Sequence, residues 1–175
     1  TGAYASLGEK VLTRATTHSA APYQIPHTKA DCYSMYTNNP PAGAFRGFGV
    51  LQSAFAIESM MDMLAEKLGL DPFYLRQINA LKTGSTTNTG QLLTESVGLL
   101  ECLERVQNKL YAIDGPEPFK PVHYERDSQN FVSAWGIAAA FKNTGLGSGA
   151  EDKSGAEVEL YEDGTLQVRS SAAEL

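Results

Sequence analysis

The sequence is short of the side chains that most protein metal sites require. Among its 175 residues are only two cysteines, Cys32 and Cys102, which lie far apart and form no Cys-x-x-Cys motif, and three scattered histidines. This distribution predicts no metal-ligating set in the chain and argues against a zinc site. Two cysteines without a disulfide framework favour a reducing compartment, so we expect a cytoplasmic protein.

Long apolar runs and an excess of positive charge are also missing. No run reaches the roughly 20 apolar residues of a membrane-spanning helix. The formal net charge of −6 argues against nucleic acid or a membrane surface as the main partner. An apolar content of 42% is that of a globular protein with a core. The chain starts at Thr1 and stops at Leu175 inside a strand-like stretch, so we expect a segment of a longer protein.

Apolar residues at helical spacing predict three helices. The strongest pattern runs over 50–68, and Gly69 follows it where a helix-ending glycine belongs. A second helix over 71–80 begins with an Asp-Pro pair, which supplies an N-cap and a first-turn proline. A third is expected over 98–112. The Met and Phe side chains of the first helix are expected to fill the core.

Alternating apolar and polar residues predict a C-terminal β-hairpin, with one face buried. Its apolar residues are Ala156, Val158, Leu160, Leu166 and Val168, and Asp163-Gly164 supplies the turn. Residues 29–36 favour a strand, residues 131–142 a largely buried strand, and residues 1–20 either a helix or a strand. The fold class is therefore α+β.

Residues 37–52 form the most unusual stretch of the chain. Two prolines stop helix and central strand, and three glycines then allow tight turns just before the strongest helix. Phe45, Arg46 and Phe48 lie among these glycines. Backbone N–H groups, a guanidinium and a ring at a helix N-terminus suit an anionic, planar ligand. An ordinary turn, with rings in the core and Arg46 paired to a surface carboxylate, explains the same residues as well.

Familiar catalytic motifs are absent. Gly145-x-Gly147-x-Gly149 follows an apolar stretch, but no helix follows it to bind a pyrophosphate, so a dinucleotide site is not predicted. The sequence has no Walker A motif and no Gly-x-Ser-x-Gly nucleophile motif.

The loop nevertheless resembles one family closely. Ala44-Phe45-Arg46-Gly47-Phe48-Gly49 is similar to a segment of the molybdenum hydroxylases, the xanthine dehydrogenase and aldehyde oxidoreductase family. Other stretches fall in the family's order: Gly2-Ala3-Tyr4, Arg14, Ala21-Pro22-Tyr23, Tyr36-Thr37-Asn38, Asp71-Pro72, Arg76-x-x-Asn79-Ala80 and Ser170-Ser171-Ala172-Ala173-Glu174. The resemblance implies a fragment of a molybdopterin-binding domain with mixed sheets, packed helices and the hairpin. Residues 1–130 would end a first molybdopterin-binding subdomain, and 131–175 would begin a second.

The resemblance also implies roles for individual residues. Those that would bind the molybdenum–molybdopterin cofactor are Ala44, Phe45, Arg46 and Gly47. Phe48 would stack on a flat substrate, and Arg14 would stabilise negative charge that develops on the substrate during the reaction. Leu146 stands loosely where purine-specific members place a second stacking ring. Aldehydes or another N-heterocycle therefore fit as well as a purine.

The resemblance implies that the chain is part of a molybdenum-dependent hydroxylase or dehydrogenase. Such an enzyme oxidises an aldehyde or N-heterocycle with water-derived oxygen. Iron–sulfur clusters and FAD would lie on partner subunits or domains. The family's general-base glutamate and its Gly-Gln-Gly loop are not in this sequence, so the isolated chain is expected to be inactive. The alternatives are a non-catalytic assembly or accessory module with the same fold, and a small-molecule carrier that uses Phe48 and Arg14.

Overall fold

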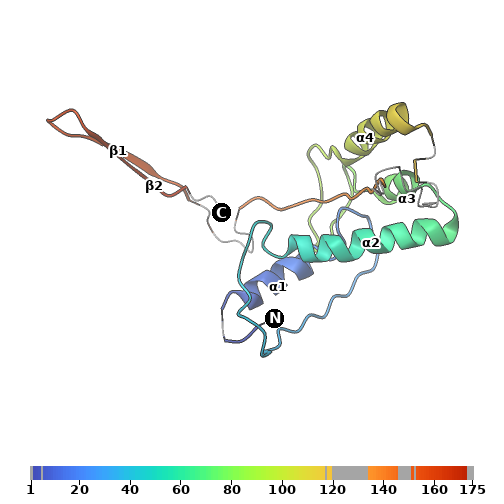
Figure 1. The fold of residues 1–175 in the computed structure, drawn as a ribbon, viewed down its shortest axis with the longest axis horizontal. Helices are drawn as coiled ribbons and strands as arrows, with labels where there is room; N and C mark the ends of the chain where they lie inside the picture. Colours follow the sequence, from blue (N-terminus) through green and yellow to red (C-terminus); the bar gives the residue numbers. More distant parts are fainter. Residues whose placement is uncertain are drawn as a thin grey trace, which may run out of the picture. The chain divides into compact units, whose positions relative to one another are not determined.

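A computed structural model describes residues 2–4, 6–116, 118–119, 134–145, 151 and 153–172 of the chain. Its elements are the helices α1 (Gly8–Thr17), α2 (Val50–Leu68), α3 (Pro72–Asn79) and α4 (Leu99–Asp114), and the strands β1 (Ala156–Leu160) and β2 (Leu166–Ser170) (Figure 1). Contacts divide the chain into two compact units, Thr1–Phe141 and Lys142–Leu175. The α+β class is thus confirmed, with the helices in the first unit and the hairpin in the second.

The first unit begins with α1, which settles the open choice between helix and strand near the N-terminus. This helix contacts α2 closely at Gly49, the residue just before α2. A β-carbon on Gly49 would lie 2.1 Å from the carbonyl oxygen of Val11 and 2.9 Å from the backbone nitrogen of Ala15. Only glycine therefore permits this approach of the two backbones.

The predicted ends of α2 and α3 are confirmed. Gly69 takes the left-handed conformation, with φ of 65°, and its N–H donates to the carbonyl of Glu66 at 3.1 Å. The Asp71 carboxylate then accepts a hydrogen bond from the backbone N–H of Tyr74 at 2.9 Å, and so caps α3. The chain thus reverses between α2 and α3 in a turn that glycine and aspartate fix.

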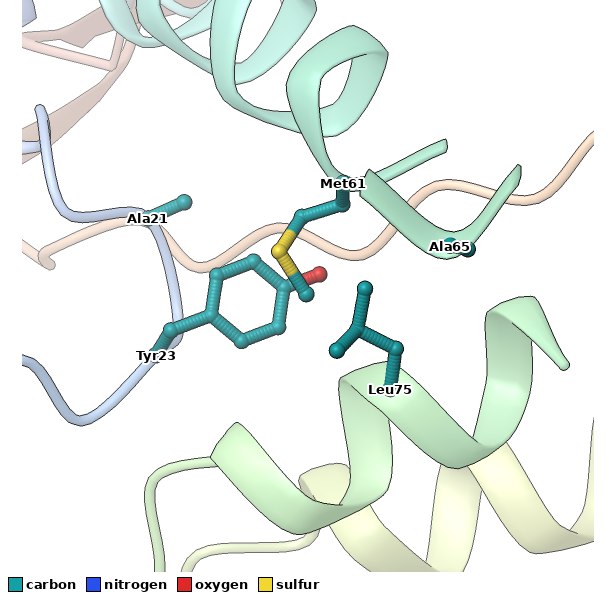
Figure 2. Packing of buried hydrophobic residues seen from close by; sticks show 5 residues of the cluster. All are labelled: Ala21, Tyr23, Met61, Ala65 and Leu75. Carbon is teal, nitrogen blue, oxygen red and sulfur yellow. The ribbon is translucent and has the colours of Figure 1, made fainter. Parts of the chain in front are cut away.

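Apolar residues of the first unit gather in two core clusters. One joins α2 and α3 to the segment after α1 and contains Ala21, Tyr23, Met61, Ala65 and Leu75 (Figure 2). The other joins α3 and α4 to the chain beyond residue 134 and contains Phe73, Ala80, Leu103, Leu110 and Ala139. Because α3 contributes to both clusters, it is the element around which the first unit packs.

The expectation that the Met and Phe side chains of α2 fill the core is wrong for most of them. Met61 is buried, but Phe55 and Met63 are 78% and 68% exposed, and Met60 is exposed as well. The described chain covers only the stripe of α2 that carries Val50, Glu58, Met61 and Ala65. Ile57 packs partly buried against the first core cluster, whereas the exposed apolar residues of the helix have no covering element in the described part.

Two predicted strands do not form among the residues that the structure describes. Residues 29–36 are irregular and mostly exposed, because no described strand runs beside them. Next to this stretch, the Thr37 N–H donates to the Gly2 carbonyl and the Ala3 N–H donates to the Asn39 carbonyl, which holds the chain beside the N-terminal residues. Of the strand predicted over 131–142, residues 131–133 lie outside the described residues, and 134–142 pair with no other strand. The core role of this stretch is retained, since Ala139 is buried.

The second unit contains the predicted hairpin. β1 and β2 are antiparallel, with Val158 opposite Val168 and Leu160 opposite Leu166. On the other face, Arg169 donates to Glu157 at 3.1 Å and to Glu159 at 2.9 Å. The alternation was therefore interpreted correctly, but the expected burial of the apolar face is wrong for the described residues, where all four of these side chains are exposed.

Two further expectations fall where the structure describes nothing. The proposed subdomain boundary at residue 130 lies outside the described residues, as does most of the glycine-rich loop over 145–149. The described residues 134–141 pack within the first unit. None of the described helices is both long enough and apolar enough to cross a membrane.

Candidate functional site

The Arg/Phe loop, residues 44–49, reaches α2 through three consecutive residues with positive φ. These angles are 87° at Gly47, 52° at Phe48 and 109° at Gly49. Phe48 is the only one with a side chain, and a non-glycine residue in this region costs about 1–2 kcal/mol. Hydrogen bonds hold the turn: the Phe48 N–H donates to the Phe45 carbonyl at 2.8 Å, and the Val50 N–H donates to the Gly47 carbonyl at 3.1 Å.

The same turn leaves backbone donors available. Within the described chain, the N–H groups of Ala44, Phe45 and Gly47 donate to no acceptor. The Phe45 ring is largely exposed, and the Arg46 side chain is exposed too. Backbone N–H groups beside a guanidinium form an arrangement that binds anionic groups. The residues at the loop therefore fit a cofactor that carries phosphate and anionic metal ligands.

Arg14 and Phe48 are brought together although 33 residues separate them along the chain. Arg14 lies in the last turn of α1, and its guanidinium carbon is 5.9 Å from the centre of the Phe48 ring. Both side chains are half-buried. A cation over a ring at this distance contributes about 0.5–2 kcal/mol, depending on how far the pair is desolvated. The contact between α1 and Gly49 is what places these two side chains opposite each other.

A buried ionic network, which the sequence did not predict as a site, joins α2 to α3. Arg76 and Glu58, whose side chains are 0% and 6% exposed, form an ion pair at 2.8 Å. Arg76 also donates to Asp62 at 2.8 Å and to the Ile137 carbonyl at 3.0 Å. Glu58 accepts from the Tyr23 hydroxyl at 2.5 Å and from the Ala139 N–H at 2.9 Å.

Burial and charge shift the ionisation of this network. Burial raises the pKa of Tyr23, and the hydrogen bond and negative charge of Glu58 raise it further. For Arg76, burial alone would lower the pKa, but hydrogen bonds to Asp62 and Glu58 outweigh it and raise the pKa. Tyr23 therefore stays neutral and Arg76 stays charged at neutral pH. No polar side-chain atom buried in the described structure lacks a hydrogen-bond partner.

A signal for the network was present in the sequence. Glu58 stands three and seven residues before Met61 and Ala65, so it lies on the buried stripe of an otherwise clear helical pattern. A carboxylate at such a position requires a buried cation. Arg76 was singled out only as part of a family motif, because no local pattern shows which carboxylate it meets.

Two further sequence-based expectations concern a second stacking position and metal ligands. Leu146, considered for substrate stacking, lies outside the described residues. Among the described residues, no three His, Cys, Asp or Glu side chains gather in a group that could hold a metal ion.

Comparison with known proteins shows the class to which the chain belongs, that of molybdopterin-binding segments. The sequence model of the molybdopterin cofactor-binding domain matches residues 1–80. The nicotinate dehydrogenase large molybdopterin subunit of Eubacterium barkeri is 49% identical over 117 residues, which are 67% of this chain and 28% of that protein. Aldehyde oxidoreductase of Megalodesulfovibrio gigas is 33% identical over 170 residues, or 97% of this chain and 18% of that protein.

Solved structures show the same relationship. The aldehyde oxidoreductase of Desulfovibrio desulfuricans matches with a TM-score of 0.62 and 27% identity, over 95% of this chain and 17% of that one. The chain belongs to the molybdenum hydroxylase family, the family of xanthine dehydrogenase and aldehyde oxidoreductase, as a segment of its molybdopterin-binding part. It spans 18% to 28% of the length of the two sequence relatives described above.

Proposed function

We propose that the whole protein is a molybdenum hydroxylase that oxidises an N-heterocycle or an aldehyde, and that this segment supplies part of its active site. The pairing of Arg14 with the Phe48 ring beside the free amides of the loop carries this proposal. A relative named for nicotinate and another named for aldehydes support the two substrate classes. We further propose a cytoplasmic enzyme whose iron–sulfur clusters and FAD lie on partner subunits or domains.

The loop would hold the molybdenum–molybdopterin cofactor. The N–H groups of Ala44, Phe45 and Gly47 would donate to its anionic groups, and Arg46 would balance its negative charge. When bound, the cofactor supplies the two-electron redox chemistry by which water-derived oxygen enters the substrate. Because the turn at Gly47–Gly49 is fixed by its own hydrogen bonds, these donors are placed before the ligand arrives.

Phe48 and Arg14 would act on the substrate. The Phe48 ring offers a flat, apolar face to a planar ring. The Arg14 guanidinium lies within reach of that ring, where it favours a substrate that carries negative charge or acquires it in the transition state. Neither residue takes or gives a proton in this proposal. The base that removes one lies in another part of the enzyme.

The test is made on the intact enzyme purified through a tag on this chain. We expect near-stoichiometric molybdenum and pterin in the unchanged enzyme. Arg14→Met should leave that content intact and lower kcat/KM for an N-heterocyclic acid or an aldehyde by about 100-fold, the usual loss of one charge-stabilising group. Arg46→Ala should lower the cofactor content itself.

Arg105→Met is the matched control, since Arg105 is exposed on α4 and pairs only with Glu101 among the described residues. It should change neither cofactor content nor kcat/KM. A fully assembled enzyme that holds neither molybdenum nor pterin would refute the proposal and favour the non-catalytic assembly module.

A further inference from the structure

The segment over 137–141 is an extended stretch of chain (Figure 1). Side chains of α2 and α3, rather than a neighbouring strand, bond to its backbone along one edge. On that edge, Arg76 donates to the Ile137 carbonyl at 3.0 Å, and the Ala139 N–H donates to Glu58 at 2.9 Å. Backbone groups two residues apart in an extended chain point to the same edge. The buried ion pair thus bonds two backbone groups of this edge, one carbonyl and one N–H.

The backbone groups of the opposite edge belong to Ala138 and Ala140. Neither makes a backbone hydrogen bond within the described part of the chain. Beside them lies an apolar groove with a volume of about 580 Å³, whose walls include Leu99, Leu103 and Val106 of α4. No charged side chain lines this groove. An unpaired strand edge and an apolar groove therefore lie next to each other.

We propose that this groove receives a β-strand from the remainder of the same hydroxylase polypeptide. The chain covers only 17% of the solved aldehyde oxidoreductase chain, so most of such a polypeptide lies outside this segment. Its backbone would pair with Ala138 and Ala140, and every second side chain, being apolar, would enter the groove. The inference rests on family membership and does not require the proposed catalytic roles.

A strand fits these observations better than other occupants. A helix has used its own backbone groups and cannot pair with the donors and acceptors of Ala138 and Ala140. Those groups repeat at the two-residue spacing of a strand, and peptide groups next to an apolar surface need a partner once water is excluded. Docking of a strand would also complete the pairing that residues 134–142 lack in this segment.

The first test is photo-crosslinking of the intact enzyme. Benzoylphenylalanine is placed at Val106, in the groove, and in a second variant at Ile113, which is on the same helix, similarly exposed (60% against 54%) and outside the groove. We expect the probe at position 106 to crosslink to residues i and i+2 of an apolar segment of the same polypeptide beyond residues 1–175. The probe at position 113 should not label that segment.

Several results would overturn the proposal. Crosslinks at i, i+3 and i+4 would show a helix, and crosslinks to a partner subunit or to a second copy would show a different source. No crosslink at 106 would show an open groove. Equal labelling of one segment from 106 and 113 would show contact without a specific groove.

The rate at which a thiol reagent modifies Cys102 provides a second test, because Cys102 is exposed in this chain and lines the groove. In the intact enzyme, a thiol reagent should modify Cys102 slowly. Val106→Asp should raise that rate by about tenfold or more by loosening the strand, whereas Ile113→Asp should not. Fast modification of Cys102 in the unchanged enzyme would contradict the proposal, even if the Val106 variant fails to assemble.

Discussion

At the scale of single residues, Glu58 has the largest structural role that sequence analysis did not assign. Its carboxylate joins Tyr23, Arg76 and the backbone of Ala139, which come from three separate parts of the chain. A partnered buried charge adds little over an apolar core, but one that loses its partner is costly. The contribution of Glu58 is therefore to fix which segments meet.

Glu58→Gln should lower the free energy of unfolding by about 3–5 kcal/mol, because it leaves the buried Arg76 charge without its main partner. Urea unfolding followed by circular dichroism measures this loss. Asp62→Asn is the control: Asp62 pairs with the same guanidinium, but its side chain is half-exposed. Its loss should be about 1 kcal/mol or less. Equal losses in the two variants would contradict the assigned role of Glu58.

The raised pKa of Tyr23 predicts that the free energy of unfolding depends on pH. Its pKa is raised in the folded state above the ordinary value of about 10. The folded state then holds a proton that the unfolded state releases, so the free energy of unfolding should fall as the pH rises above about 10. Tyr23→Phe should remove that part of the slope.

Tyr111→Phe is the comparison for the pH experiment. Burial and the hydrogen bond to Asp71 act on the Tyr111 hydroxyl and raise its pKa as well, yet it lies outside the Glu58 network. The Tyr111 variant should keep the slope that Tyr23 causes. If unfolding titrations above pH 10 gave the Tyr23 variant and the unchanged chain the same slope, Tyr23 would not be the group responsible.

At the scale of elements, the approach of α1 to Gly49 decides whether Arg14 meets Phe48. Gly49→Ala should destabilise the first unit by more than 2 kcal/mol, as overpacking against backbone does, since the new β-carbon would meet the Val11 carbonyl oxygen at 2.1 Å. Gly69→Ala shares the positive φ but has no atom within 4 Å of its β-carbon. It should cost about 1–2 kcal/mol, the strain alone.

Thermal unfolding of the two glycine variants tests this difference. In the intact enzyme, the Gly49 variant should also lose activity, because the Arg14–Phe48 contact opens when α1 moves away. Losses of similar size in the two variants would mean that α1 and α2 separate easily, and that their contact does not position the site.

Local sequence patterns predicted an element well where a capping or turn residue marks its end. Asp71 and Gly69 mark the ends of α3 and α2, and the Asp163-Gly164 turn fixes the register of the hairpin. The strand predicted over 29–36 failed because strand formation needs a partner, which local sequence does not supply. The Arg14–Phe48 contact was likewise beyond pattern analysis, and only a family resemblance grouped these two residues in one site.

At the scale of the whole molecule, both units of the described chain expose apolar side chains. In the first unit it includes Leu51, Phe55 and Met63 of α2, and in the second unit the apolar face of the hairpin. The apolar residues of the hairpin are cross-strand neighbours and form one patch, and stable monomers seldom expose large contiguous apolar patches. The rest of a longer polypeptide would cover them, as the lengths of the relatives allow.

The last prediction concerns this surface. Produced alone, the 175-residue chain should bind the dye ANS and self-associate at micromolar concentration, because Val158, Val168 and their neighbours on one face of the hairpin are exposed. Val158→Lys with Val168→Glu should reduce both, since the residues are cross-strand partners and the new charges attract. Glu157→Gln with Arg169→Gln, on the opposite face, should change neither. Sedimentation velocity and ANS fluorescence measure the outcome. A monomeric chain that binds no dye would show that the segment shields its own apolar faces and needs no further polypeptide to do so.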